Sequence, residues 1–507
     1  MTRRTLLLGI DIGTSGTKAV LYTPEGRAVA ETSRAYAFDS PRPGWAEQDP
    51  TVWWEAVCAC LQELADRPDV DPREIVSLGL TGQMQGLVLL DADGEPVCPA
   101  ILWCDTRIAR ECAETEEIIG LETLLEITGN RALNNCTGPK YLWVRRHMPE
   151  AAARAVHLLV PKDYIRYRLT GRYAGEPTDA SGTLLFDTGH FCWSEEVCRA
   201  LGIDTSLLPP IVPSAGIAGT VTPGAAMATG LPSGLPVAGG AGDNAAAAVG
   251  VGAVNSGQAF TTIGTSGVIY THTDHYTYER AGRVHTYCSP VAGEWAYLAS
   301  IQSAGFALRW FRENCCGDLP EADAAGLDAF AYLDREAASV PPGSEQLFFL
   351  PYLMGERAPH FDPNARACFI GLSARHGRPE MTRAVMEGVS FAFADCLALC
   401  HEMGVRVDSM TLCGGGGKSA LWRQMLADIF RFPIAEPMAR EGASLGAALL
   451  GGVGVGVYAN VRTACAQVCA SRSVLQPNPE DLYAPIYAIW RRLYPAMRDI
   501  FADMAAQ

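Results

Sequence analysis

The chain has 507 residues, of which 48% are apolar and 19% charged, so it is long enough for two or more hydrophobic cores. Its formal net charge of −16 lacks the overall basic footprint of a nucleic-acid-binding protein. No C-x-x-C pair occurs among its 17 cysteines, so we expect reduced thiols in a cytoplasmic protein. The apolar run at residues 6–10 is too short for a signal peptide, and no uninterrupted apolar run predicts a membrane span.

The chain begins with a predicted three-strand meander. Apolar, β-rich runs at residues 5–13 and 17–23 are followed by a turn and by alternating residues at 27–36. Residues 49–67 predict an amphipathic helix, because Asp49 is a good N-cap and the apolar residues after it lie on one stripe. A further strand is predicted at 75–83.

The five-residue sequence IGTSG occurs twice, at residues 12–16 and 263–267. Each copy ends an apolar β-like run and precedes another strand, which predicts two similarly built domains. After the second copy, strands and then alternating helices and strands indicate a mixed sheet flanked by helices. The predicted elements are strands at 268–273, 284–288, 294–300, 409–413 and 433–436 and helices at 304–316, 381–404, 419–430, 443–451 and 485–504.

The loop DIGTSGTK, residues 11–18, has the composition of a phosphate-binding turn. Its glycines let backbone amides approach a phosphate, while Thr14, Ser15 and Lys18 add hydroxyl donors and a cation. Asp11 could hold a hydrated Mg²⁺. For one such loop alone, an ordinary β-turn is the favoured interpretation. Two of them, the second at Gly264, Thr265 and Ser266, predict a clamp on a polyphosphate.

A glycine run at residues 414–417 lies between a predicted strand and a predicted helix. It is not a P-loop, because Leu412 stands where that motif requires glycine. Bare backbone can still support a flat ring, so Gly415, Gly416 and Gly417 are predicted to bind adenine. A plain strand-to-helix turn is the alternative.

Asp243 is the one charged residue in the Gly/Ala-rich stretch 239–250, at a predicted helix start. Aspartate is a good N-cap, which is the structural interpretation. The functional one is a general base, because phosphoryl transfer to an alcohol needs a carboxylate within hydrogen-bond reach of the hydroxyl. The two interpretations are compatible.

The chain resembles the FGGY family of carbohydrate kinases and, within it, the branch that phosphorylates xylulose. The resemblance rests on segments that follow the family order over most of the chain: GIDIGTSGTKAVL (9–21), GWAEQDPTVWW (44–54), LTGQMQGLVLLD (80–91), ILWCDTR (101–107), PKYLWVRRH (139–147), LVPKDYIRYRLTG (159–171), GGAGDNAAAAVGVG (239–252), IGTSGV (263–268), FLPYLMGERAPHFDP (349–363), GLSARHG (371–377) and GGGGKSALWRQMLADIF (414–430).

The resemblance implies an α/β fold with two ribonuclease-H-like domains of the actin, hexokinase and Hsp70 ATPase type around a central cleft, with the domains at residues 1–246 and 247–507. It implies a small-molecule sugar and MgATP as ligands, phosphorylation of a ketopentose such as D-xylulose at O5, and a homodimer. Asp243 matches the catalytic base, and Asp11 and Asp243 are expected near Mg²⁺. The residues expected to bind the sugar are Gln83, Met84, Gln85, Trp103, Asp105 and Asn244.

Two departures from the family pattern concern the sugar. Gln85 stands where xylulokinases usually carry histidine, and glutamine cannot become cationic. Cys104, next to Asp105, stands where a polar residue is expected. Alternatives are therefore kinases of the same family that act on ribulose, fuculose, gluconate or a polyol. From other classes, an actin- or chaperone-like ATPase and a catalytically silent sugar sensor are kept as alternatives.

Overall fold

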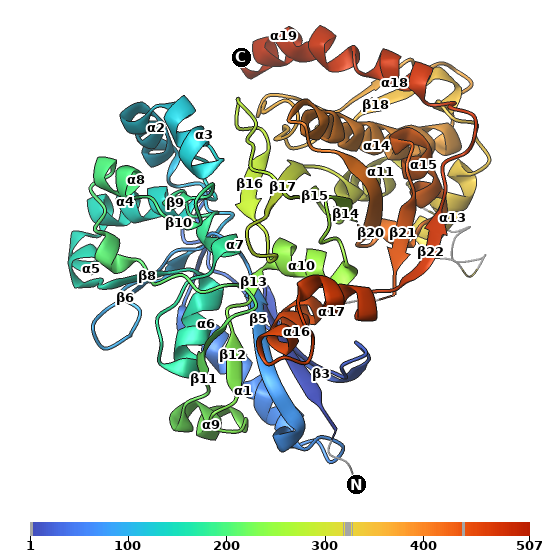
Figure 1. Ribbon diagram of the computed structural model, residues 1–507. Coiled ribbons are helices and arrows are strands. Elements are labelled where there is room, and N and C mark those ends of the chain that lie inside the picture. The colour runs from blue at the N-terminus through green and yellow to red at the C-terminus, as the bar shows by residue number, and fades with distance from the viewer. Residues whose placement is uncertain (1–3, 318, 320–325, 327, 439–441, 507) are drawn as a thin grey trace. The chain divides into compact units, whose positions relative to one another are not determined.

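The structure is a computed structural model that describes residues 4–317, 319, 326, 328–438 and 442–506 (Figure 1). Its contacts divide the chain into two compact units. Unit 1 comprises Met1–Asn255, His272–Ala296 and Ala439–Ala470, and unit 2 comprises Ser256–Thr271, Tyr297–Met438 and Ser471–Gln507. The first break therefore lies after Asn255 and not at residue 246, and two later segments return to unit 1.

The sheet of unit 1 combines an antiparallel meander with parallel strands. Its order is β11-β12-β5-β1-β2-β3, with β13 also paired to β5. The meander β1-β2-β3 is antiparallel, whereas β5 is parallel to β1, β12 and β13. The predicted strands at the start of the chain are thus confirmed. The strands are β1 (Leu6–Ile12), β2 (Gly16–Tyr22), β3 (Ala28–Ala35), β5 (Ile75–Gly82), β11 (Ile217–Thr220), β12 (Pro236–Ala238) and β13 (Ala241–Gly242).

The two faces of this sheet are covered by helices far apart in the sequence. On one face, apolar side chains of β1 and β5 pack with the stripe of α1 (Pro50–Ala65), capped by Asp49 as predicted. On the other face lies α16 (Gly442–Gly454), which approaches closely because β1 and β5 carry glycines there. A Cβ on Gly79 would lie 1.8 Å from the Ala447 carbonyl oxygen. This packing is why a late segment of the chain belongs to unit 1.

Unit 2 repeats the sheet arrangement of unit 1. Its strands run β17-β15-β14-β20-β21-β22, with β14 and β15 antiparallel, β14 and β20 parallel, and β20 and β21 parallel. The second IGTSG copy forms the β14–β15 turn, as the first forms the β1–β2 turn. This duplicated order confirms the predicted ribonuclease-H-like fold class. The strands are β14 (Gly257–Ile263), β15 (Gly267–Thr273), β17 (Trp295–Ile301), β20 (Val407–Cys413), β21 (Ile434–Pro437) and β22 (Ser471–Leu475).

Two helical segments of unit 2 differ from the sequence-based expectations. The helix α14 (Arg378–Glu402) is long and apolar enough to cross a membrane, although none was predicted, but 83% of its most apolar window is buried, as in a core helix. The expected helix at 485–504 is two helices, α18 (Ala484–Trp490) and α19 (Leu493–Ala505). Pro495 explains the break, because its ring would clash with the Arg491 carbonyl in a continuous helix.

Among the remaining helices, those at 109–147 and 195–200 pack with one another in a second apolar core of unit 1, to the left of its large sheet in Figure 1. The remaining helices of unit 1 are α2 (Ala109–Ile119), α3 (Leu121–Thr128), α4 (Thr137–His147), α5 (Pro149–Arg154), α6 (Pro161–Thr170), α7 (Pro177–Ala180), α8 (Glu195–Ala200), α9 (Pro223–Thr229), α10 (Asp243–Val251) and α17 (Val461–Val468). In unit 2 they are α11 (Gly305–Cys315), α13 (Ala329–Ala337) and α15 (Ala420–Phe430).

Candidate active site

Three parallel strands of unit 1 end side by side. In register, Ile12 of β1 lies beside Gly82 of β5, and Gly82 lies beside Gly242 of β13. The residues that follow these three ends are the loop at 13–15, the segment 83–85, and the pair 243–244. Ligands of open α/β sheets bind outside the carboxyl ends of the strands. The register thus brings three separately predicted motifs to one edge of one sheet.

Asp243 is the first residue of α10, and its carboxylate does not cap the helix. The N-cap position is Gly242, and no side chain caps this end. Instead, Asp243 Oδ1 accepts hydrogen bonds from the backbone N–H of Asn244 at 2.6 Å and from its side-chain Nδ2 at 2.8 Å. Asn244, expected to contact the sugar, therefore also orients Asp243. The positive end of the helix dipole favours a carboxylate at this position.

The half-buried Asp243 carboxyl is a weaker acid than an ordinary aspartate. Burial raises its pKa to about 6, while the two bonds from Asn244 act in the opposite direction. A carboxylate with a pKa close to the working pH is a better proton acceptor than one near 4 and is still ionised at neutral pH. Its position and its pKa both suit a general base.

The loops at the ends of β1 and β5 are tied together by polar side chains. The Thr14 hydroxyl donates to Gln83 Oε1 at 3.2 Å and accepts from the indole N–H of Trp103 at 2.9 Å. The Gln83 amide in turn donates to Gln48 Oε1 at 3.2 Å. Gln83 is buried, whereas Trp103 is 41% exposed. Ser15, beside Thr14, is also exposed.

Gln85 uses both ends of its side-chain amide within unit 1. Its Oε1 accepts from Asn135 Nδ2 at 2.8 Å, and its Nε2 donates to the hydroxyl of Tyr287, on β16 (His285–Cys288), at 3.0 Å. Its backbone is left-handed, with φ of 64°, and the ammonium group of buried Lys140 donates to its carbonyl at 2.7 Å. Gln85, which stands where xylulokinases usually carry histidine, is thus part of a hydrogen-bond network that holds the segment 83–85 in place.

Met84 lies against the turn that carries Asp243. A Cβ added to Gly242 would lie 2.7 Å from Met84 Cγ, so a larger residue at position 242 would displace the Met84 side chain. Met84 is buried, so only a small part of its side chain faces outward.

Asp105 is completely buried in an ion-pair network. Its Oδ2 accepts from the backbone N–H of Ala46 at 2.6 Å and pairs with the Arg107 guanidinium at 2.7 Å. Arg107 also pairs with Glu47 at 2.6 Å and lies over the ring of Trp45, 3.6 Å from its centroid. These contacts fix the position of the Asp105 carboxylate, and its expected contact with the sugar stays a prediction.

Asp11 and Lys18 face each other across β1 and β2. They are cross-strand partners, and therefore lie on the same face of the sheet. Lys18 pairs with Glu31 at 3.3 Å. Within the ranges that the structure describes, no cluster of three or more His, Cys, Asp or Glu side chains could hold a metal ion. A half-exposed carboxylate such as Asp11 fits Mg²⁺, which keeps several waters and takes few protein ligands when phosphates are bound.

Unit 2 contains a cavity of about 560 Å³ at the corresponding edge of its own sheet. It is lined by Gly264 and Thr265 after β14 and by Gly415 and Gly416 after β20, four residues that were predicted to bind the nucleotide. Ser266 and Gly417 do not line it; Gly417 is buried, and its carbonyl accepts from Arg423. The volume suits a ligand of nucleotide size.

Several residues that sequence reasoning missed complete this cavity. Phe306 and Arg309 on α11, Asp334 on α13, and Ser419 and Trp422 next to the glycine run all line it. The Ser419 hydroxyl caps α15 and donates to Asp334 Oδ1 at 2.5 Å. Only Ser419 and Trp422, which lie just beyond the glycine run and Lys418, could have been found from the sequence. The others come from segments with no motif of their own.

Profiles of known families match both halves of the chain. The N-terminal domain of the FGGY family of carbohydrate kinases matches residues 6–250, and the C-terminal domain of that family matches residues 259–455. The chain belongs to the FGGY family of carbohydrate kinases. As an FGGY kinase, it transfers a phosphoryl group to a sugar hydroxyl and takes a sugar and a nucleotide as substrates.

Similar proteins cover nearly the whole length of this FGGY kinase. It is 36% identical to a xylulose kinase of Escherichia coli (strain K12), over 98% of this chain and 100% of the relative. It is 34% identical to a xylulose kinase of Bacillus subtilis (strain 168), over 97% of both chains. The crystal structure of xylulose kinase from Rhodospirillum rubrum has a TM-score of 0.91 and 30% identity, covering 98% of this chain and 100% of that one.

Proposed function

We propose that the chain is an ATP-dependent xylulose kinase that phosphorylates D-xylulose at O5, with Asp243 as the general base. The observation that carries the proposal is the register of β1, β5 and β13, which places Asp243 beside the segment 83–85 and the loop at 13–15. The nearly full-length similarity to xylulose kinases supports the choice of sugar.

In this mechanism Asp243 accepts the proton of the attacking sugar hydroxyl as the terminal phosphoryl group of ATP is transferred in line. Asn244 keeps Oδ1 oriented through two hydrogen bonds, so the proton goes to Oδ2. Trp103, which is 41% exposed, and Met84, which lies against the turn before Asp243, form the wall against which the sugar binds. Gln85 acts by holding this segment through Asn135 and Tyr287.

The nucleotide roles are assigned to two groups of residues. The cavity of unit 2 takes the adenosine against Gly415 and Gly416. Phosphate contacts by Thr14, Ser15 and Lys18 and by the loop 264–266, like the expected homodimer and cytoplasmic location, stay predictions. Mg²⁺ would be held with Asp11 and would offset negative charge on the phosphates. Asp243, also expected near the metal, is assigned to the proton instead.

The proposal is tested by a coupled ATP assay across sugars. We expect D-xylulose to give the highest kcat/KM among D-xylulose, D-ribulose, L-fuculose, D-gluconate and polyols, and the product to be a 5-phosphate by NMR. A higher kcat/KM for another acceptor would assign the chain to another kinase of the same family. ATP hydrolysis without any phosphorylated sugar would favour the actin-like ATPase alternative.

The raised pKa of Asp243 predicts an acidic limb in the pH profile. Only the ionised carboxylate accepts a proton, so kcat/KM for the sugar should fall below pH of about 6 and approach a tenfold loss for each further pH unit. The profile is measured at saturating Mg²⁺ and ATP, with circular dichroism to confirm folding at each pH. A rate constant that stays level down to pH 4.5 would contradict an ionising base at Asp243.

A further inference from the structure

A cluster of buried charges lies next to the turn that carries Asp243. Lys162 on α6 is completely buried, with its Nζ 2.6 Å from Asp163 Oδ1, 3.2 Å from Asp179 Oδ2 and 3.6 Å from Glu176 Oε1. Arg166, one helical turn further on, is also completely buried and pairs with Asp163 at 2.7 Å. These residues belong to the segments 159–171 and 175–182, to which the proposed mechanism gives no role.

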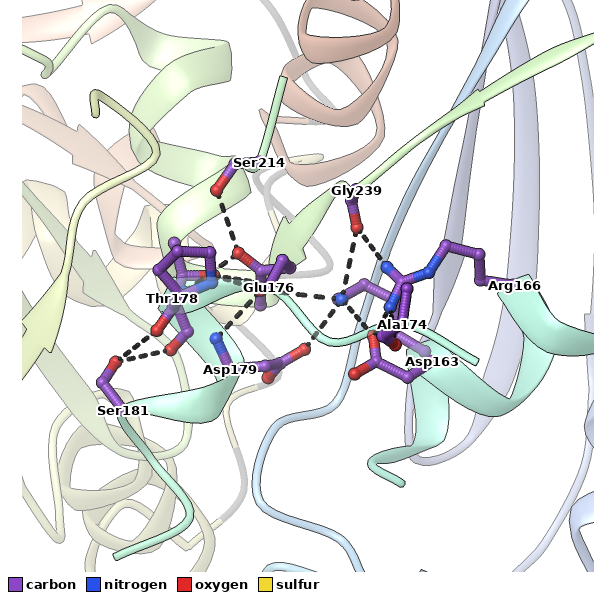
Figure 2. Close-up of polar contacts among 12 residues, drawn as sticks. Asp163, Arg166, Ala174, Glu176, Thr178, Asp179, Ser181, Ser214 and Gly239 are labelled. Carbon is purple, nitrogen blue, oxygen red and sulfur yellow. Dashed lines mark hydrogen bonds and ion pairs between the residues drawn. The ribbon is translucent and has the colours of Figure 1, made fainter. Parts of the chain in front are cut away.

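The cations of the cluster hold one end of the glycine turn. Arg166 Nη1 donates to the Gly239 carbonyl at 2.6 Å, and Lys162 Nζ lies 3.5 Å from the same oxygen. Figure 2 shows Arg166 directed at Gly239, with Asp163 beneath the guanidinium. The turn has no side chains that could hold it in place, because residues 239–242 are Gly-Gly-Ala-Gly. The cluster adds side-chain hydrogen bonds to the backbone pairing of this turn with β5.

The second contact with the glycine turn is made by Thr178 at Gly242, and the carboxylate of Glu176 orients Thr178 for it. This carboxylate accepts from the backbone N–H groups of Thr178 and Asp179 at 2.9 Å each, from the Ser214 hydroxyl at 2.9 Å and from the Thr178 hydroxyl at 2.7 Å (Figure 2). Because the Thr178 hydroxyl uses its proton on Glu176, its oxygen is left to accept, and it does so from the backbone N–H of Gly242 at 2.9 Å. Gly242 immediately precedes Asp243.

The positive and negative charges of the buried cluster are close to balance. Lys162 and Arg166 face three carboxyl groups, those of Asp163, Glu176 and Asp179. Burial raises the pKa of the Asp179 carboxyl well above its usual value, partly offset by Lys162. The raised pKa favours the neutral form of Asp179, which lowers the excess of negative charge that the two cations have to balance.

We propose that this buried cluster positions the catalytic base. It binds the glycine turn 239–242 by hydrogen bonds at the Gly239 carbonyl and at the Gly242 N–H, and it thereby fixes the position of the Asp243 carboxylate. Thr178 is the positioning residue that connects the cluster to the base. The inference rests on the proposed role of Asp243, and it assigns a purpose to residues that do not touch the substrate. Small displacements of a catalytic group cost up to about a hundredfold in rate, so a rigid support for a turn of glycines matters.

The test removes the Thr178 hydroxyl while keeping its shape. Thr178→Val should lower kcat by about 10- to 100-fold and leave KM for MgATP unchanged, whereas Thr178→Ser should keep most of the wild-type kcat. Thr178→Ala replaces the valine variant if that does not fold. Thr188→Val is the matched control, because Thr188 is equally buried but donates to Thr128 O and not to the turn; its kcat should stay at the wild-type value.

A double-variant cycle separates positioning from general loss of structure. If Thr178 acts through the base, Thr178→Val should cost no further activity in an Asp243→Asn background, whereas an equal loss in both backgrounds would overturn the proposal. A wild-type kcat for Thr178→Val beside an impaired Asp243→Asn would also overturn it. A wild-type kcat for Asp243→Asn would instead overturn the proposed base, so the two failures are distinguishable.

Discussion

Replacing Asp243 by asparagine is expected to lower kcat by about 10²- to 10⁴-fold, the usual contribution of a general base. Asparagine has nearly the same shape and leaves α10 and its Gly242 N-cap in place. It cannot accept a proton at the oxygen that the sugar hydroxyl would reach. The measurement is kcat with D-xylulose in the coupled assay, using long incubations for the residual rate.

The same substitution should not weaken the fold. The pKa of Asp243 is raised to about 6 in the folded protein, so the folded state binds the proton more tightly than the unfolded chain does. The protonated carboxyl therefore stabilises the fold, and this stabilisation is lost as the pH rises through 6. At pH 8 the folded protein therefore bears the cost of a buried charge that asparagine removes. The melting temperature of Asp243→Asn should be equal to or above that of the wild type.

The matched control for this variant is Asp49→Asn. Asp49 caps α1 through a 2.9 Å bond from the Thr51 N–H, and asparagine caps helices equally well. This control should keep both kcat and stability. Near-normal turnover of Asp243→Asn would show that another group takes the proton, whereas a lowered melting temperature would show that the carboxylate holds the structure together.

The second large effect is expected on stability, from Lys162→Met. Removing this cation leaves Asp163, Glu176 and Asp179 with Arg166 alone, in a site without solvent. Breaking a buried charge pair from one side costs about 3–5 kcal/mol, because the remaining charges stay desolvated. The expected result is a large fall in the midpoint of urea unfolding, followed by circular dichroism and by tryptophan fluorescence.

Arg199→Met is the matched control for the loss of a cation. Arg199 is 78% exposed and lies 3.8 Å from Glu195, so its removal should change stability by less than about 0.5 kcal/mol. An unfolding midpoint for Lys162→Met equal to that of this control would mean that water or a shifted side chain compensates the cluster.

Local patterns in the sequence were sufficient for the elements that depend on near neighbours. The meander at the start of the chain, the capped helix α1 and the two IGTSG turns follow from alternation, capping and glycine, which act over a few residues. Their duplication predicted the two sheets, and the order of the motifs predicted the family. The helix break before Leu493 was also encoded locally, in Pro495, but the apolar pattern around it favoured one continuous helix.

Contacts between segments far apart in the chain could not be predicted from local sequence patterns. The side-chain amide of Gln85, whose expected contact with the sugar stays a prediction, is bound by Asn135 and Tyr287, which lie 50 and 202 residues away. The carboxylate of Asp105 accepts from the backbone N–H of Ala46, which lies 59 residues away. The hydrogen-bond partners of a polar side chain depend on which segments the tertiary packing brings next to it. Sequence patterns over a few residues do not determine that packing.

By itself, then, the sequence determined which chemical groups are available: a carboxylate in a glycine-rich stretch at a helix start, two glycine loops and a glycine run after a strand. The tertiary structure alone decided their arrangement. The pairing of β13 with β5 brings Asp243 to the ends of β1 and β5, and α16 returns to unit 1 through glycine contacts. The reason is physical: propensities act through a residue's own turn or strand, whereas register and burial depend on the whole chain's packing.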